Sequence, residues 1–228
     1  MKLSIVIPAY NEASTIKEVL SRIGEVPFDK EIIVVDDGSS DGTGEILKEV
    51  SRNGSNIKLF QHEKNKGKGA ALRTAFTAVT NEVIIIQDAD LEYDPCDYQS
   101  LLGPILDGKA DVVFGSRFLG GPHRVLYFWH FVGNKLLTLL SNMLTNLNLS
   151  DMETGYKAFR KEVLKDLRIR SNRFGIEPEL TAKVAKRKFR IYEVPISYSG
   201  RTYLEGKKIT WRDGLAAIFL IVWFHFFD

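Results

Sequence analysis

The chain has 228 residues, of which 44% are hydrophobic and 26% are charged, so it can bury a substantial core as one domain or as a domain with an extension. That composition excludes a disordered tail. The 31 basic and 29 acidic side chains give a net charge of only +2, which argues against a protein that coats nucleic acid through its phosphates. The single cysteine, Cys96, excludes an internal disulfide and a cysteine-rich zinc site, and it favours a reducing compartment.

Short apolar runs alternate with helical patterns through the first half of the chain. The first run, Met1 to Pro8, is too short for a signal-peptide core and lacks a small-residue cleavage site, so we interpret it as a buried strand. We predict strands over residues 3–7, 31–35, 57–61, 82–86 and 111–114, and helices over residues 13–23 and 42–50. This alternation predicts an α/β fold: a doubly wound, mostly parallel sheet with helices on both faces and ligands outside the carboxyl ends of its strands.

Two apolar segments mark the second half. Residues 125–147 are long enough to cross a bilayer, but polar side chains recur along one side: Asn134, Thr138, Ser141, Asn142 and Thr145. We therefore predict one or two amphipathic helices, either packed on the core or lying at a membrane interface. Residues 215–227 are apolar nearly all round but too short for a straight span, which predicts a docked or surface-immersed helix.

The charge is uneven along the chain. The segment from Lys183 to the last residue contains nine basic and four acidic side chains, so the remainder of the chain is slightly acidic. A basic end beside a very apolar segment indicates an anionic partner, such as a bilayer surface or an anionic substrate. A solvated basic face remains the alternative.

Carboxylates gather where two predicted strands end. Asp36 and Asp37 follow the second strand, and four acids follow the fourth: Asp88, Asp90, Glu92 and Asp94. Acidic oxygens on one loop, without a His or Cys cluster, suit Mg²⁺ or Mn²⁺, which keeps coordination sites for substrate phosphates. Asp-x-Asp alone arises often by chance, but its position directly after an apolar strand favours a metal site.

Two further loops suit a nucleotide. Residues 8–12 follow the first strand and open a helix, offering the aromatic face of Tyr10, backbone amides and Glu12. Residues 36–43 follow the second strand, where Asp37 is available to a ribose or base and glycines allow close approach. For residues 8–12 the alternative is an ordinary turn and helix start. For residues 36–43 the alternative is a helix-capping turn.

Taken together, four motifs resemble the family-two glycosyltransferases of GT-A fold, and closely their polyprenyl-phosphate hexosyltransferase branch, which includes dolichyl-phosphate mannose synthase. In chain order these motifs are Pro8-Ala9-Tyr10-Asn11-Glu12, Asp36-Asp37-Gly38-Ser39, Asp88-Ala89-Asp90 and Gly115-Ser116-Arg117-Phe118. Residues 151–159, 200–203 and 211–214 extend the resemblance over nearly the whole chain. It implies a GT-A-like catalytic domain over residues 1–200, including the helices near 125–147, with residues 201–228 as its membrane-proximal extension.

The resemblance also implies roles for individual residues. Asp88 and Asp90 would hold the divalent ion that bridges the diphosphate, and Glu92 stands where mannose synthases tend to carry Gln as a further ligand. Arg117 and Arg201 match basic residues associated with the acceptor phosphate or the leaving diphosphate, and Arg124 aligns more loosely with the same role. The catalytic set would be Asp90, Arg117 and Arg201. Positions that contact the nucleotide sugar are matched by Pro8, Tyr10, Glu12, Asp37 and Asp88.

The chemistry of the acceptor gives an independent argument. A sugar hydroxyl needs a general base, whereas a phosphate monoester, with a second pKa of about 6, is already largely a dianion at neutral pH and needs cations to position it. The basic candidates are Arg117, Arg201, Lys207 and Lys208. Glu177 and Glu179 are candidate bases for a hydroxyl acceptor, although we favour a helix-capping role for Glu177. The Gln-x-x-Arg-Trp signature of processive polysaccharide synthases is absent, which argues against polymerisation.

The sequence thus predicts a peripheral enzyme on the cytoplasmic face of a membrane. It would move a hexose, mannose or glucose, from GDP-mannose or UDP-glucose to dolichyl or undecaprenyl phosphate, with inversion and with Mg²⁺ or Mn²⁺. One alternative is a soluble glycosyltransferase that acts on a sugar or protein hydroxyl. A non-catalytic receiver-like module is more remote, because its acid pair would follow the first strand and its length would be roughly half. The oligomeric state is not predicted.

Overall fold

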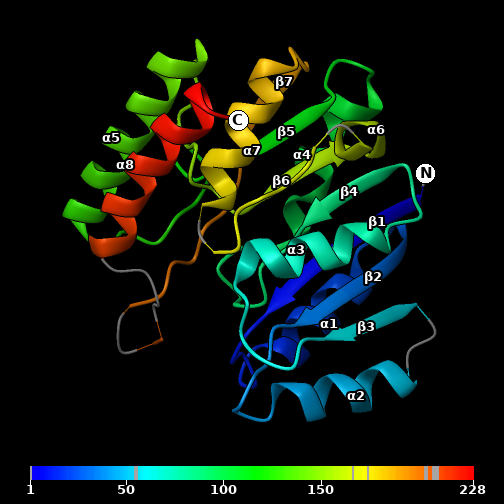
Figure 1. Cartoon of the computed structure of the whole chain (residues 1–228). Coiled ribbons are helices and arrows are strands. Elements are labelled where there is room, and N and C mark those ends of the chain that lie inside the picture. Colours follow the sequence, from blue (N-terminus) through cyan, green and yellow to red (C-terminus); the bar gives the residue numbers. More distant parts are fainter. Residues whose placement is uncertain (1, 54–55, 166, 174, 203–204, 207–210) are drawn as a thin grey trace.

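A computed structural model of the chain describes residues 2–53, 56–165, 167–173, 175–202, 205–206 and 211–228. The part described contains a seven-stranded sheet of order β3-β2-β1-β4-β6-β5-β7 (Figure 1). Its strands are β1 (Lys2–Ala9), β2 (Asp29–Asp36), β3 (Ile57–Gln61), β4 (Val83–Ile86), β5 (Val112–Ser116), β6 (Lys157–Arg160) and β7 (Ile191–Pro195). All five predicted strands are confirmed, with ends that differ by at most two residues.

The sheet is mostly parallel, as predicted. β1 pairs in parallel with β2 and β4, β2 with β3, and β5 with β7. The exception is β6, which runs antiparallel to both β4 and β5. β6 was not predicted, because it has only four residues and begins and ends with a basic one.

Helices cover both faces of the sheet. One face carries α1 (Ile16–Glu25), α2 (Thr43–Asn53) and α4 (Tyr98–Leu106), which follows the short 3-10 helix η1 (Pro95–Asp97). The other face carries α3 (Lys68–Thr77), α6 (Lys161–Lys165) and α7 (Ile176–Lys186). Of the two predicted helices, residues 13–23 begin as turns before α1, and residues 42–50 match most of α2.

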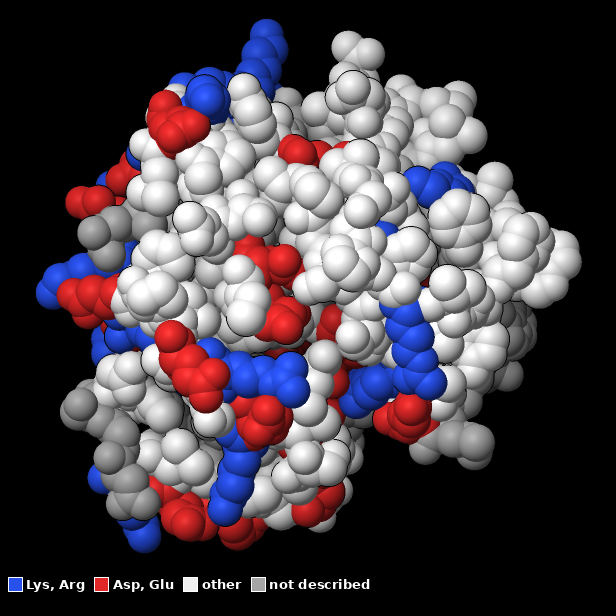
Figure 2. Space-filling model, turned by 180° about the vertical axis from the view of Figure 1, so that it is seen from behind, with Lys and Arg blue, Asp and Glu red and all other residues white. Residues whose placement is uncertain are grey.

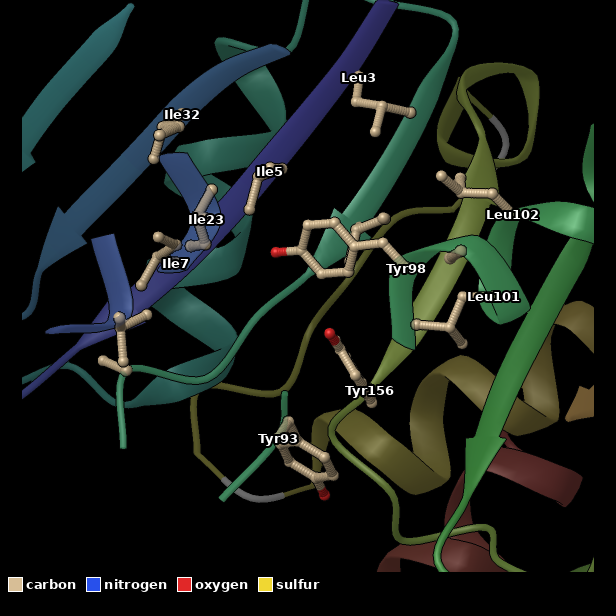
Figure 3. Packing of buried hydrophobic residues seen from close by; sticks show 14 of the residues in the cluster. Leu3, Ile5, Ile7, Ile23, Ile32, Tyr93, Tyr98, Leu101, Leu102 and Tyr156 are labelled. Atoms are coloured by element: carbon tan, nitrogen blue, oxygen red, sulfur yellow. The ribbon is translucent and has the colours of Figure 1, made fainter. Parts of the chain in front are cut away.

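Alternation along the strands produces two buried layers. On β1, Ile5 and Ile7 belong to one hydrophobic cluster and Val6 to the other, and all three side chains are fully buried. Figure 3 shows the first cluster, where the β1 side chains lie near Ile23 of α1 and Tyr98 of α4. Burial of apolar surface at about 25 cal/mol per Å² stabilises both layers, so the carboxyl ends of the strands are held on a rigid support.

The segment predicted as one or two amphipathic helices is one helix, α5 (Phe128–Thr145), which packs against α7 and α8 (Trp211–Phe226). Its polar stripe faces the protein: Thr138 and Ser141 are buried, and Asn142 donates a hydrogen bond to the carbonyl of Leu149 at 2.7 Å. Its opposite side exposes large apolar side chains, among them Trp129 and Met143. In the described residues, neither α5 nor any other helix has the length and hydropathy needed to cross a bilayer.

Candidate active site

The predicted acids lie at the carboxyl end of the sheet. Asp88 and Asp90 follow β4, and Glu12 follows β1 beside them. Pro8 lies within β1, and Tyr10 is exposed just after that strand. Figure 2 shows acidic and basic side chains side by side over part of the face seen from behind.

Arg201 binds three carboxylates at once. Its guanidinium lies 2.8 Å from Asp90 Oδ2, 3.2 Å from Glu12 Oε2 and 3.2 Å from Glu92 Oε1. Burial and the negative charges of Asp88 and Glu92 raise the pKa of Asp90 to about 7, against the attraction of Arg201. The fold therefore joins four of the predicted site residues, although they are far apart in sequence.

Asp88 has a different cationic partner. Lys68 Nζ, at the first residue of α3, lies 2.8 Å from Asp88 Oδ1 and 3.0 Å from Glu177 Oε1. Glu177 therefore binds a lysine, and our preference for a helix-capping role was wrong: the N-cap of α7 is Gly175, without a side-chain cap. Lys68 was missed, although its position between two glycines before a helix was a usable signal.

Asp37 is engaged inside the protein. Its carboxylate accepts hydrogen bonds from the backbone N–H groups of Gly67 at 2.6 Å and Lys66 at 3.0 Å, and its Oδ1 lies 2.6 Å from His62 Nδ1. These contacts fix the loop that leads into α3. Contact of Asp37 with a nucleotide stays a prediction. The capping alternative for residues 36–43 is confirmed at Asp41, which accepts from the N–H of Thr43 at 3.0 Å.

Arg117 follows β5 and forms a bidentate ion pair with Asp151. Its Nε and Nη2 lie 2.7 Å and 2.8 Å from the two oxygens of Asp151, which is fully buried. Although burial opposes the charge, Arg117 holds the pKa of Asp151 below its ordinary value. The guanidinium also lies 5.2 Å from the ring centroid of Tyr198, whose hydroxyl donates to Glu92 at 2.8 Å. Tyr198, which sequence reasoning missed, thus connects Arg117 with the Arg201 cluster.

The remaining basic candidates are less central. Arg124 is half-exposed and pairs with Glu205 at 2.8 Å, on the segment that carries Arg201. Lys207 and Lys208 lie outside the described residues, as does the side chain of Arg212. Glu179 accepts hydrogen bonds from the N–H groups of residues 170 and 171 and pairs with Lys183, so its carboxylate is fully engaged.

The aspartate pair fits a metal that shares its coordination with a substrate. Within the described ranges, no group of three or more His, Cys, Asp or Glu side chains is arranged to hold an ion. Mg²⁺ commonly takes one or two carboxylates together with substrate phosphates and water, and Asp88 with Asp90 supplies that number. All three acids bind protein cations here, Asp88 through Lys68 and both Asp90 and Glu92 through Arg201, so metal ligation by Asp88, Asp90 and Glu92 stays a prediction.

Comparisons with known proteins identify the family of the chain. Residues 4–168 match the family "Glycosyl transferase family 2". The chain is 31% identical over 221 residues to a dolichol-phosphate mannosyltransferase of Pyrococcus furiosus, covering 92% of this chain but only 61% of that protein. It is also 31% identical to a UDP-N-acetylglucosamine–dolichyl-phosphate N-acetylglucosaminyltransferase of Methanococcus voltae, covering 91% of this chain and 93% of the relative.

A solved structure shows the same fold. Glucosyl-3-phosphoglycerate synthase of Mycobacterium tuberculosis, in complex with Mn²⁺, UDP and its product, superimposes with a TM-score of 0.74 over 97% of this chain and 77% of that protein, at 22% identity. At that identity the likeness shows the GT-A-like architecture alone. The family match covers most of the chain, and the relatives cover nearly all of it. The chain therefore belongs to glycosyl transferase family 2.

Proposed function

We propose that this glycosyltransferase moves one hexose from a nucleotide diphosphate-sugar to a polyprenyl phosphate, with inversion at the anomeric carbon. The observation that carries the proposal is the linked pair of arginines: Tyr198 and Glu92 join Arg117 and Arg201 beside the aspartates that suit a metal. The names of the Pyrococcus and Methanococcus relatives, both of which use dolichyl phosphate, support the same acceptor.

The residues suit an acceptor that is already ionised. A phosphate oxygen would attack the anomeric carbon while the bond from that carbon to the diphosphate oxygen breaks, and no proton has to be removed first. Arginines bind phosphate through paired N–H donors. Arg201 would therefore orient either the acceptor phosphate or the leaving diphosphate. A divalent ion held by Asp88 and Asp90 would neutralise charge on the departing diphosphate. Mg²⁺ and Mn²⁺ are both candidates, and the structural relative was crystallised with Mn²⁺.

The rival function is transfer of the hexose to a hydroxyl acceptor, which needs a carboxylate as general base. Its candidate bases are less suited to the role than the sequence suggested, because Glu177 pairs with Lys68 and Glu179 holds two backbone N–H groups. The experiment is a panel of GDP-mannose, UDP-glucose and UDP-N-acetylglucosamine with a short polyprenyl phosphate and Mg²⁺ or Mn²⁺. Labelled hexose extracted into organic solvent supports the proposal, and label that passes only to water-soluble acceptors contradicts it.

The membrane part of the proposal rests on the α5/α8 apolar face. Its exposed members are Phe128, Trp129, Leu136, Leu139 and Met143 of α5 with Leu215, Phe219, Trp223 and Phe226 of α8. The side of the molecule that carries α5 and α8 is nearly without charged side chains in Figure 2. Contiguous apolar surface of this kind marks protein or membrane contacts, and tryptophans suit the headgroup boundary. We propose that this face lies on the cytoplasmic leaflet, from which a lipid acceptor enters the site.

Vesicle flotation tests this orientation. The double variant Trp129→Ser with Phe219→Ser should bind anionic vesicles about tenfold or more weakly, because each side chain contributes roughly 1.5–3 kcal/mol when buried in an apolar phase. Leu106→Ser, an exposed apolar residue on α4, is the matched control and should bind like the native protein. Unchanged binding by the double variant would contradict the orientation. Native binding that resists salt, alkali and mild detergent would contradict a peripheral protein.

A further inference from the structure

We propose that Glu153, together with Lys68, forms a subsite that binds hydroxyl groups of the hexose being transferred. We call this pair the hexose subsite. The proposal rests on the donor half of the proposed function and adds a specificity-determining residue to it.

Glu153 is a half-buried carboxylate with an unsatisfied oxygen. Its Oε1 is shielded from solvent and accepts no hydrogen bond from any described residue. Burial, reinforced by the negative charge of Glu177, raises the pKa of the Glu153 carboxyl to about 8. Burying a polar atom without a partner destabilises a fold. A cost of this kind is common where a ligand supplies the missing partner.

The position of Glu153 follows from its neighbours two residues away on each side. Asp151 holds Arg117 through two bonds of 2.7 Å and 2.8 Å. Gly155 packs so closely on Asp88 that an added Cβ would lie 2.3 Å from its Oδ2, and the N–H of Gly155 donates to the hydroxyl of Tyr93 at 3.0 Å. Since two residues span at most about 7 Å, the backbone of Glu153 lies within that distance both of Asp151, which binds Arg117, and of Gly155, which packs on Asp88. In the proposal, the transferred hexose would occupy the space between Arg117 and Asp88.

Lys68 supplies the complementary donor. The same hypothetical Cβ on Gly155 would lie 3.0 Å from Lys68 Nζ, so the 151–155 segment passes directly beside this ammonium. Lys68 pairs with Asp88 and Glu177, yet 16% of its side-chain surface stays exposed. A sugar hydroxyl both donates and accepts hydrogen bonds, so neighbouring hydroxyls can donate to Glu153 and accept from Lys68. A diphosphate only accepts hydrogen bonds, so it offers no donor to Glu153 Oε1.

Calorimetry without lipid tests the subsite apart from the acceptor. The affinities for GDP-mannose, UDP-glucose and the matching diphosphates are measured with Mn²⁺ for the native protein, Glu153→Gln, Glu153→Ala and the control Glu162→Gln, an exposed glutamate on α6. We expect Glu153→Ala to weaken binding of the nucleotide sugar about tenfold while leaving the diphosphate unchanged. Glu153→Gln should lose less, and Glu162→Gln nothing. The melting temperatures of the Glu153 variants should equal or exceed that of the native protein.

An unchanged ratio of sugar-nucleotide to diphosphate affinity in Glu153→Ala would overturn the subsite, even if turnover falls, because that pattern belongs to a base or a structural residue. If the variant does not fold, monodeoxy sugar nucleotides and the native protein decide: at least one should bind about tenfold more weakly than its parent, and uniform binding overturns the subsite. Binding of a nucleotide sugar without transfer to lipid would contradict only the proposed acceptor. If no nucleotide sugar binds, the subsite fails together with the donor.

Discussion

Arg117 and Arg201 reach the same end of the sheet from two regions that treat them differently. Arg117 follows β5 and is locked by one carboxylate, the fully buried Asp151. Arg201 follows β7 and is shared among Glu12, Asp90 and Glu92, all of which border the predicted metal site. A cation bound by one fully buried partner is part of the framework, whereas a cation shared among three acids, two of which keep some exposed surface, can exchange one of them for a ligand. Removal of Arg117 and removal of Arg201 should therefore have different effects on stability and on transfer.

The largest effect is expected at the carboxylate that Arg201 shares with the metal. Asp90→Asn should lower transfer by about 10²–10³-fold, because it removes a charged metal ligand without touching the core. The measurements are steady-state turnover with Mn²⁺ and the melting temperature, which should stay close to the native value. Near-normal turnover of the variant, or undiminished native turnover in excess chelator, would contradict the metal assignment.

Removing Arg117, which Asp151 holds in place, should lower stability as well as activity. Arg117→Ala leaves the fully buried Asp151 without its cation, although the N–H groups of residue 117 and Asn134 remain as donors, so we expect a loss of about 3 kcal/mol in the free energy of unfolding. Denaturant unfolding measures it. The double variant Arg117→Met with Asp151→Leu is the control: it should recover much of the stability but not the use of polyprenyl phosphate. If the double variant regains transfer, the role of Arg117 is structural alone.

Removing the shared arginine should act mainly on transfer. For Arg201→Ala we expect a smaller loss of stability than for Arg117→Ala, since Asp90 and Glu92 keep some exposed surface and the raised pKa of Asp90 lets it take up a proton. The lipid kcat/KM should fall about 10–100-fold, because charge-assisted bonds to the acceptor phosphate are lost. Calorimetry of the nucleotide, beside kinetics in the lipid, separates the two sites. A collapse in nucleotide affinity with unchanged lipid dependence would assign Arg201 to the donor.

Glu31, a carboxylate at the opposite end of the sheet, serves as a control for both arginines, because its loss should change stability but not transfer. Glu31 accepts from Lys58 Nζ at 2.7 Å and from Thr80 N–H at 2.7 Å, and although burial opposes it, these bonds lower its pKa to about 2. Glu31→Gln should lower stability at pH 7 by about 2 kcal/mol without changing transfer.

The sign of its pH dependence follows from the lowered pKa. Because the folded pKa lies below the ordinary value, the contribution of Glu31 is complete above about pH 5 and is lost as the pH falls toward 2. The difference in unfolding free energy between the native protein and Glu31→Gln should shrink over that range. A difference independent of pH would show that the carboxylate charge contributes nothing.

The parallel half of the fold could be predicted because each of its strands is a continuous apolar run, as in β4. β6 could not be predicted, since its Lys157 is buried, where its ammonium donates to the carbonyls of Met152 and Thr154 and lies over the ring of Phe114. The inward orientation of the α5 polar stripe has the same cause: its partners lie in the 149–152 segment. The local sequence pattern predicts an amphipathic helix, but it does not show which side of that helix the rest of the chain will cover.

The candidate site divides in the same way. The positions of Asp88 and Asp90 after a strand were readable from local pattern. The sharing of Arg201 among three acids was not, because it depends on how the segment after β7 folds back over β1 and β4. Tyr198 was missed for the same reason, because its role comes from Glu92 and Arg117, which are distant in sequence. Lys68 carried a local signal in its flanking glycines, but its partners Asp88 and Glu177 are likewise distant.

The central claim is that the two arginines serve an acceptor phosphate, and the most direct measurement compares one polyprenol with and without its phosphate. Both lipids are presented in the same vesicles, with the nucleotide sugar that the protein binds and Mn²⁺, and labelled hexose is counted in the organic phase. The account predicts transfer to the phosphorylated lipid only, since the site offers cations to position a dianion and no unengaged base among Glu177 and Glu179. Equal transfer to the unphosphorylated polyprenol would contradict it.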